Sequence, residues 1–296
     1  MGTVNDDYPT KAKKQMTDAD LKAKAIAQYE AKETDETKSS KFPTEIIELP
    51  SRGILYPKGS ELSKGKIEMK YMTAREEDIL TNQSYIKQGV VLDKLFKALI
   101  ISDINYNELF LGDKNAIMIA ARILGYGKDY ELEVMNPSGE KQKITVDLTK
   151  LGEKEVDWES LEKSEGVLTV GLPASKREVT IQLLTHGVQK KIDAEMKGLS
   201  KLKKDAQMTT LLKHVITSVD GDTETKTIRH FVDNELFAID ARAIRTRLSE
   251  VTPDIDLEID CIDEEDGEPF RSNVNIGLDF LWHGSKLYGK RIRSNI

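Results

Sequence analysis

The pattern of apolar and polar residues predicts both strands and helices. Residues 66–72 alternate between polar and apolar, which is typical of a half-buried strand. The apolar face of this strand consists of Ile67, Met69 and Tyr71. Between residues 92 and 100 the apolar positions follow the spacing i, i+3, i+4, i+7 and i+8, which forms one stripe along a helix.

Capping signals predict where several helices begin and end. Thr73 is followed three residues later by Glu76, the pattern of a capping box, so we expect a helix to begin there. We expect Asp113 to cap a later helix, which stops at the glycines of residues 125–127. Apolar alternation over residues 128–148, interrupted by a turn-forming NPSG sequence, predicts a β-hairpin.

One stretch of this pattern occurs twice. LFLGDKNAI begins at Leu109 and LFAIDARAI begins at Leu236, and both continue without insertion into an acidic alternating strand. Every matched residue number in this stretch differs by 127. Four further pairs of segments match in the same order: 49–50 with 172–173, 67–73 with 179–185, 95–102 with 211–218, and 144–148 with 274–278. Because ordered matches of this kind indicate a repeated structural unit, we interpret the chain as an internal duplication.

The predicted fold class is therefore α+β, with the order strand, helix, helix, helix and β-hairpin occurring twice. A polar stretch at 220–226 lengthens the second copy. The predicted parts are an N-terminal arm (1–41), a first repeat (42–148), a charged linker (149–166), a second repeat (167–284) and a basic C-terminal tail (285–296). The arm is polar, with a thin apolar side between residues 18 and 32, and is either a disordered tail or a segment that folds onto a partner.

Composition narrows the class of protein. The chain of 296 residues is 39% apolar and 32% charged with a net charge of -7, which gives no general argument for binding nucleic acid or an anionic membrane. Its longest apolar run, residues 90–101, is far shorter than the roughly 20 residues of a membrane span, and no secretory signal is visible. Cys261 is the single cysteine, so no intrachain disulfide is possible and a reducing compartment is expected. We expect a soluble protein made in a cytoplasm.

The residue types of common catalytic sites do not form a recognisable motif. The four histidines lack metal-binding spacing, and we interpret them as structural or surface residues. Cys261 lies on a predicted strand in an acidic segment, which favours a buried structural thiol over a nucleophile. The acidic strand from Asp254 to Asp260 has three interpretations: a solvated face, a docking surface for a basic partner, or a cation site for a hydrolase. A calcium loop is excluded because Ile259 stands where that loop needs glycine. We expect no catalytic residue, cofactor or metal.

The remaining candidates are basic or aromatic residues for contacts with other proteins. Arg242, Arg245 and Arg247 lie in the second LFxxD helix, and are either a solvated helix face or a docking surface. The basic tail contains Lys286, Lys290, Arg291 and Arg293, and Trp282 is the aromatic candidate just before it. Four basic residues in a tail are too few to establish nucleic-acid binding.

Several motifs resemble one known family. The LPSRG turn, the strand ending in MTAREEDIL, the LFLGD helix ending in RILGYG and the following hairpin resemble baseplate hub and hub-assembly proteins of T-even-type contractile-tailed bacteriophages. The segment IGLDFLW, which ends at Trp282, is similar to the aromatic ending of that family. The resemblance covers about residues 43–284. Relatives can carry paired cysteines for a zinc ribbon in the hairpins. This chain has only Cys261, so the resemblance does not imply a metal site here.

The resemblance implies a non-enzymatic baseplate protein, either a hub subunit or a hub-assembly factor. Its partners would be other tail and baseplate proteins, met in the cytoplasm of the infected host or in the virion tail. The alternative is a nucleic-acid-binding virion or packaging protein that uses the basic tail and the arginine helix. A metal-dependent hydrolase built on the acidic strand is the third alternative.

Overall fold

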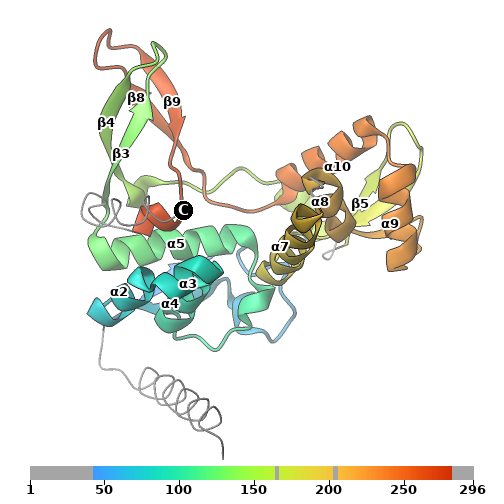
Figure 1. The fold of residues 1–296 in the computed structure, drawn as a ribbon, viewed down its shortest axis with the longest axis horizontal. Helices are drawn as coiled ribbons and strands as arrows, with labels where there is room; N and C mark the ends of the chain where they lie inside the picture. The colour runs from blue at the N-terminus through green and yellow to red at the C-terminus, as the bar shows by residue number, and fades with distance from the viewer. Residues whose placement is uncertain (1–42, 164–166, 203–205, 282–296) are drawn as a thin grey trace, which may run out of the picture. The chain divides into compact units, whose positions relative to one another are not determined.

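The computed structural model describes residues 43–163, 167–202 and 206–281 (Figure 1). The predicted arm and the predicted basic tail lie outside the described residues.

The described residues form an α+β fold, as the sequence predicts. Elements before residue 150 are β1 (Thr44–Glu48), η1 (Glu61–Lys64), β2 (Lys66–Lys70), α2 (Ala74–Thr81), α3 (Gln83–Gln88), α4 (Val91–Leu99), η2 (Tyr106–Glu108), α5 (Leu111–Tyr126), β3 (Asp129–Met135), β4 (Lys141–Asp147) and η3 (Leu148–Lys150). Later elements are α6 (Trp158–Lys163), β5 (Leu168–Gly171), β6 (Glu178–Ile181), α7 (His186–Lys201), α8 (Gln207–Val215), β7 (Ile216–Val219), α9 (Thr225–Asn234), α10 (Ala238–Val251), β8 (Glu258–Ile262), β9 (Pro269–Asn273) and η4 (Leu278–Leu281).

The strands among the described residues form small antiparallel sheets. β1 pairs with β2, β3 with β4 and β8 with β9, while β5, β6 and β7 form a three-stranded sheet. The predicted hairpin of residues 128–148 is confirmed as β3 and β4. In the second sequence copy the matching segment also forms a hairpin, β8 and β9.

A buried ion pair fixes the predicted start of α2. Glu76 accepts hydrogen bonds from the backbone N–H and the hydroxyl of Thr73, and its other oxygen lies 2.9 Å from the Lys70 ammonium. Burial pushes the pKa of Glu76 upward, but the bonds from Thr73 and Lys70 outweigh it and leave the pKa below its ordinary value. The end of β2 is thereby joined to the first turn of α2.

Asp113 is not a helix cap, contrary to the sequence prediction. The N-cap of α5 is Phe110, and the side chain of Asp113, inside the first turn, is fully buried. It accepts hydrogen bonds from the Ser51 N–H (2.9 Å), the Ser51 hydroxyl (2.7 Å) and the Tyr56 hydroxyl (2.6 Å). Asp113 therefore joins α5 to the turn after β1, a tertiary contact that sequence spacing alone does not distinguish from a local cap.

The buried side chains form two cores whose limits differ from the predicted repeats. The first core contains side chains of α2, α4 and α5, and Val274, Phe280 and Leu281 pack into it. The second core lies between Leu161 and Val251. The second hairpin and η4, which the sequence prediction assigns to the repeat of residues 167–284, thus pack against the core of the first repeat.

The sequence prediction has no helix at α3, nor at two helices in the second half of the chain, α6 and α9. α6 lies in the predicted linker, and its Leu161 is fully buried in the second core. α9 begins within the predicted polar stretch and buries Ile228, Phe231 and Val232, which have the i, i+3, i+4 spacing of a helix face. Both helices therefore belong to the second core.

Within the described ranges, no helix is long and apolar enough to cross a membrane.

Candidate interaction surfaces

Asp113 and Asp240, which match in the two sequence copies, make the same kind of contact. Asp240 is fully buried and accepts hydrogen bonds from the backbone N–H groups of Ala174 (2.7 Å) and Ser175 (3.0 Å). These residues follow Leu172-Pro173, just as Ser51 follows Leu49-Pro50. Burial raises the pKa of Asp240, but these bonds outweigh burial, and the pKa lies below its ordinary value.

The beginning of α5 in the first copy is covered by the second copy. The Leu111 N–H donates to the carbonyl of Leu184 (3.0 Å), and the His186 N–H donates to the carbonyl of Leu109 (2.7 Å). Phe110 and Thr185 are paired between these bonds in an isolated antiparallel bridge. The Phe110 ring packs on the Tyr56 ring with centroids 4.6 Å apart.

A glycine allows a second close contact beside this bridge. A Cβ at Gly112 would lie 1.9 Å from the carbonyl oxygen of Pro253 and 2.9 Å from the Cα of Asp254. One turn along α5, the Asn115 amide donates to both carboxylate oxygens of Asp254, at 3.0 and 3.1 Å. We call Phe110, Gly112 and Asn115 the covered surface.

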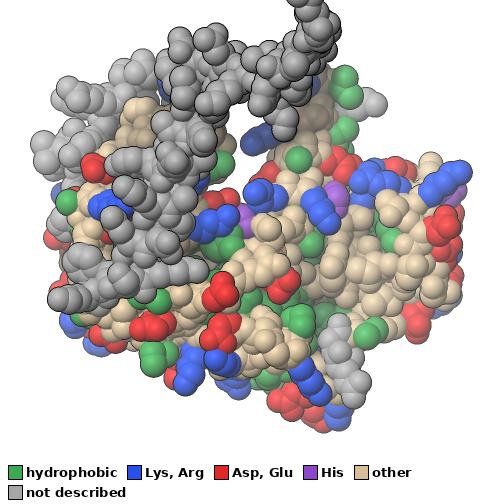
Figure 2. Space-filling view, turned by 90° about the horizontal axis from the view of Figure 1, so that it is seen from below, with side chains coloured by type: hydrophobic (Ala, Val, Ile, Leu, Met, Phe, Trp, Pro, Cys, Tyr) green, Lys and Arg blue, Asp and Glu red, His purple; other side chains and the backbone are tan. Residues whose placement is uncertain are grey.

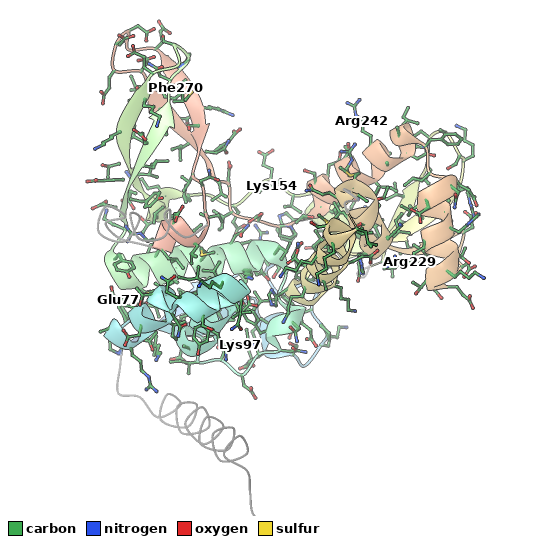
Figure 3. The ribbon with its side chains drawn as sticks, in the orientation of Figure 1. Glu77, Lys97, Lys154, Arg229, Arg242 and Phe270 are labelled. Carbon is green, nitrogen blue, oxygen red and sulfur yellow. The ribbon has the colours of Figure 1, made fainter. Side chains whose placement is uncertain are left out.

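The matching surface of α10 is exposed. Phe237 and Ile239, which correspond to Phe110 and Gly112, are each 57% exposed. Arg242, which corresponds to Asn115, is exposed, and its side chain points away from the ribbon in Figure 3. We call Phe237, Ile239 and Arg242 the open surface. Phe237 and Ile239 were not predicted as site residues; the signal in the sequence is that isoleucine replaces a glycine of the repeat.

The three predicted arginines do not form one free patch. Arg247 is ion-paired with Asp157 (2.9 Å) and Glu250 (3.3 Å), so it attaches α10 to the start of α6. Arg245 is exposed, and its Nε donates to the carbonyl of Ala241 within the same helix (3.3 Å). Arg242 is the predicted arginine that lies beside exposed apolar residues. The other predicted residues, Trp282, Lys290, Arg291 and Arg293, lie outside the described residues.

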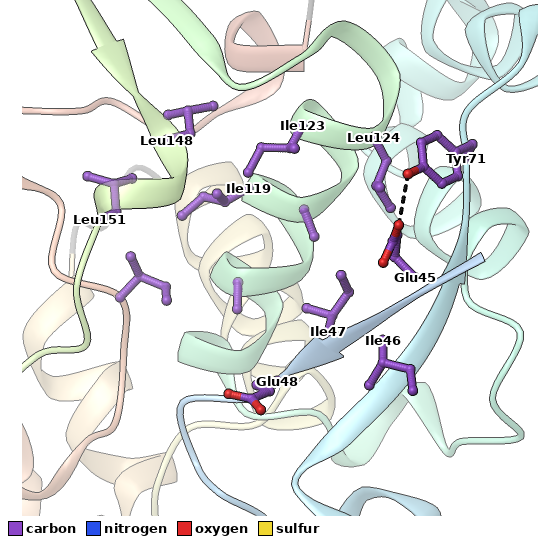
Figure 4. A pocket seen from close by; sticks show the side chains of 13 residues that line it. Glu45, Ile46, Ile47, Glu48, Tyr71, Ile119, Ile123, Leu124, Leu148 and Leu151 are labelled. Atoms are coloured by element: carbon purple, nitrogen blue, oxygen red, sulfur yellow. Dashed lines mark hydrogen bonds between the residues drawn. The ribbon is translucent and has the colours of Figure 1, made fainter. Parts of the chain in front are cut away.

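An apolar groove of about 410 Å³ lies along α5 (Figure 4). Ile119, Ile123 and Leu124 line one side, and Ile47 of β1 faces them. A hydrogen bond between Tyr71 and Glu45 (2.9 Å) closes one end of the lining. On α10, the residues matching Ala120 and Ile123 are Arg247 and Glu250, which contact the segment leading into α6. The apolar groove is thus a feature in which the two copies differ.

Charged residues of both signs are interspersed on the face drawn in Figure 2. The predicted acidic strand has Asp256, Glu258 and Asp260 on its exposed side, and Arg271 pairs with the last two at 3.1 and 3.5 Å. These three side chains are exposed, which both a solvated face and a docking surface require. Asp254 differs, because its carboxylate accepts the hydrogen bonds of Asn115.

Two of the histidines have structural partners. His186 is buried, with Nε2 3.2 Å from Asp93 and Nδ1 3.2 Å from the Lys114 ammonium. Burial, followed by the charge of Lys114, lowers the pKa of His186. His214 lies 2.9 Å from Glu195, which also receives two hydrogen bonds from Arg229. These interactions join α7 to α4 and α5, and to α8 and α9.

The remaining sequence candidates for chemistry are Cys261 and a metal site on the acidic strand. Cys261 is buried as predicted, and burial raises the pKa of its thiol, which disfavours the nucleophilic thiolate. Within residues 43–163, 167–202 and 206–281, no group of three or more His, Cys, Asp or Glu side chains is arranged to hold a metal ion.

Comparison of the chain with protein-family models, curated proteins and solved structures finds no match.

Proposed function

We propose that this chain is a non-enzymatic structural protein of a contractile-tailed bacteriophage, a baseplate hub subunit or a hub-assembly factor that acts through protein contacts. The observation that carries the interaction role is the open surface, where Phe237 and Ile239 are each 57% exposed beside Arg242. Aromatic and arginine side chains are enriched at the centres of protein interfaces. The order of motifs from LPSRG to the terminal aromatic segment supports the phage assignment.

The proposal includes an origin by internal duplication. Matched residues make matched strand pairs: Ile47 with Ile67 and Val170 with Val179, and also Met69 with Ile100 and Ile181 with Ile216. Both LFxxD helices have an extended phenylalanine N-cap, with ψ 150° at Phe110 and 153° at Phe237. Such agreement in pairing register supports two copies of one unit, because a register shift of one residue would reverse every side chain.

The partners in this proposal are other tail and baseplate proteins. The protein would meet them in the host cytoplasm during assembly, and would remain in the tail baseplate if it is a permanent subunit. The apolar groove along α5 offers a second surface for such contacts, because Ile119, Ile123 and Leu124 line it.

Mass spectrometry of purified virions, combined with deletion of the gene, tests the proposal. A hub subunit is expected in virions at a fixed ratio to other baseplate proteins. An assembly factor is expected to be absent from virions, while its deletion stops baseplate formation. A protein that is absent from virions and whose deletion leaves baseplates normal would contradict both forms of the proposal.

A further inference from the structure

The groove along α5 matches a place in the second copy that is already covered. Ile47 and Leu124 line the groove and are half-buried, and their counterparts in the second copy are Val170 and Val251. Both valines are buried in the second core together with Leu161 of α6. In the second copy, α6 therefore covers the position that is a groove in the described part of the first copy.

The repeat relates α6 to the basic tail. α6 comes shortly after η3, and the basic tail comes shortly after η4. η3 and η4 begin at matching residues, Leu148 and Leu278, whose numbers differ by 130. With the same difference, Trp158 at the start of α6 matches Tyr288 in the basic tail. An aromatic residue thus follows each copy at the same distance.

The residues before β1 are a poorer match to α6. The strand pairs that contain β1 and β5 match with a difference of 123 between residue numbers. With that difference, Trp158 and Leu161 match Asp35 and Lys38. Because charged side chains lose hydration in an apolar groove, these two residues do not suit it. The basic tail is therefore the segment of this chain that matches α6 in both position and aromatic character.

The basic tail also begins close to the groove. η4 lies against α5, and Phe280 and Leu281 are buried in the first core. The Phe280 ring contacts the Tyr130 ring, with centroids 4.8 Å apart. An extended chain spans roughly 3.3 Å per residue, so residues 282–288 can reach roughly 23 Å from this point. Because a helix with its side chains is only about 10–12 Å wide, Tyr288 can reach the groove on α5.

The charges of the groove and the basic tail are opposite. Among the described residues that line the groove, the charged ones are Glu45 and Glu48, and both are exposed. The basic tail has no acidic residue, and its basic residues are Lys286, Lys290, Arg291 and Arg293. Apolar walls with carboxylates at the rim suit a segment in which basic residues flank an aromatic one.

We propose that the basic tail binds in the groove along α5 of the same chain, with Tyr288 against the apolar wall and the basic side chains beside Glu45 and Glu48. The contact repeats the one that α6 makes with the second core. A partner protein that uses the groove must then displace the basic tail. This last consequence rests on the proposed function, whereas the contact itself rests on the repeat and on the charges of the groove.

Tryptophan fluorescence of the full-length protein tests the contact. The chain has two tryptophans, so Tyr288→Trp made together with Trp158→Phe and Trp282→Phe leaves a single reporter at the matched position. In the bound tail this reporter is expected to emit at a shorter wavelength than tryptophan in water and to resist quenching by acrylamide. High salt is expected to weaken this shielding, because it screens the exposed carboxylates of the groove.

A pair of substitutions in the groove shows where the reporter binds. Ile46→Lys combined with Glu48→Lys is expected to weaken binding of the tail about tenfold or more, since it removes an apolar contact and reverses a charge. Ile262→Lys combined with Glu264→Lys is the matched control, because Ile46 and Ile262 are 64% and 66% exposed and Glu48 and Glu264 are both exposed. Circular dichroism checks that both proteins are folded, and Glu48→Lys alone gives the same test if the groove pair is not.

The proposal predicts shielding that is lost in the groove variant, kept in the control and independent of protein concentration. A reporter as accessible as tryptophan in water would overturn it. Equal shielding in the groove variant and the control would also overturn it, since the tail would then bind elsewhere. Shielding that disappears on dilution would assign the groove to the tail of a second copy and overturn the contact within one chain. Virion mass spectrometry is independent of this result, so the two proposals can fail separately.

Discussion

The side-chain amide of Asn136 donates a hydrogen bond to the carboxylate of Asp263 at 3.1 Å, and the two residues occupy the same place in the two hairpins. Both side chains are buried. Each residue also begins its turn in the same way, since the N–H of Asn136 bonds to Glu140 and that of Asp263 bonds to Glu268. The two hairpins are therefore joined to each other at their turns, in addition to the pairing of strands within each hairpin.

Asn136→Ala is expected to lower the free energy of unfolding by about 1–3 kcal/mol, because it leaves the Asp263 carboxylate buried with one partner fewer. Urea denaturation of the full chain measures this change. Ser138→Ala in the same turn is the control, since Ser138 is exposed. Equal stability of the two variants would show that the bond between the hairpins contributes nothing.

Asp113→Ala is expected to lower the free energy of unfolding by about 3 kcal/mol, because Ser51 and Tyr56 lose the acceptor of three buried hydrogen bonds. Asp240→Ala is expected to act in the same direction through Ala174 and Ser175. Asp103→Ala is the control, because Asp103 is exposed. If Asp113 acted only as a local cap, its replacement would cost about 1 kcal/mol.

The interaction of Glu195 with Arg229 predicts a loss of stability in acid. Hydrogen bonds from Arg229 lower the pKa of Glu195 from 4.5 to about 2. Burial acts in the opposite direction, but its effect is smaller. The unfolded chain therefore binds this proton more tightly, so the stabilisation is complete above pH 4.5 and is lost as the pH falls from 4.5 towards 2. Arg229→Gln is expected to reduce stability by about 1 kcal/mol at neutral pH and to flatten this part of the pH profile. An unchanged slope of unfolding free energy against pH would contradict the assignment.

Gly112→Ala and Ile239→Ala form a matched pair that separates the covered surface from the open one. The methyl group at Gly112 would meet the Pro253 carbonyl, so we expect a loss of about 1–3 kcal/mol in the free energy of unfolding from overpacking. Ile239→Ala removes exposed atoms, and for a monomer at low concentration we expect a change within about 0.5 kcal/mol. Thermal denaturation of dilute samples measures both. A large loss at Ile239 in the monomer would mean that this side chain packs within its own chain.

Local sequence patterns predict local structure well in this protein. The stripe in residues 92–100 gives α4, the alternation of residues 66–72 gives β2, and the glycine at 127 ends α5. Each of these depends on residues within one or two turns, where periodicity and backbone preference act directly. The repeat similarly predicts that two hairpins exist.

Long-range partners could not be read from the same patterns. Asp113 has the spacing of a cap, but its carboxylate bonds to residues about sixty positions earlier in the chain. The sequence likewise gives no sign that the second hairpin packs on the first core, because its apolar residues would suit either core. Phe237 is exposed because the second copy covers the start of α5 in the first copy and not the reverse. The tertiary arrangement of the chain sets this, and local sequence patterns do not show it.

Disulfide trapping tests the central claim, that the second copy covers the start of α5 and leaves the matching start of α10 open, most directly. The bonds around Phe110 and Thr185 are those of a non-hydrogen-bonded antiparallel pair, whose Cα atoms lie about 4.5 Å apart, within the range that a disulfide spans. In a Cys261→Ser background, oxidised Phe110→Cys/Thr185→Cys is expected to give a bond within one chain, whereas oxidised Phe237→Cys/Thr185→Cys is expected to give none. A Phe110→Cys/Thr185→Cys protein that forms no bond within the chain, or a Phe237→Cys/Thr185→Cys protein that forms one as readily, would contradict the account.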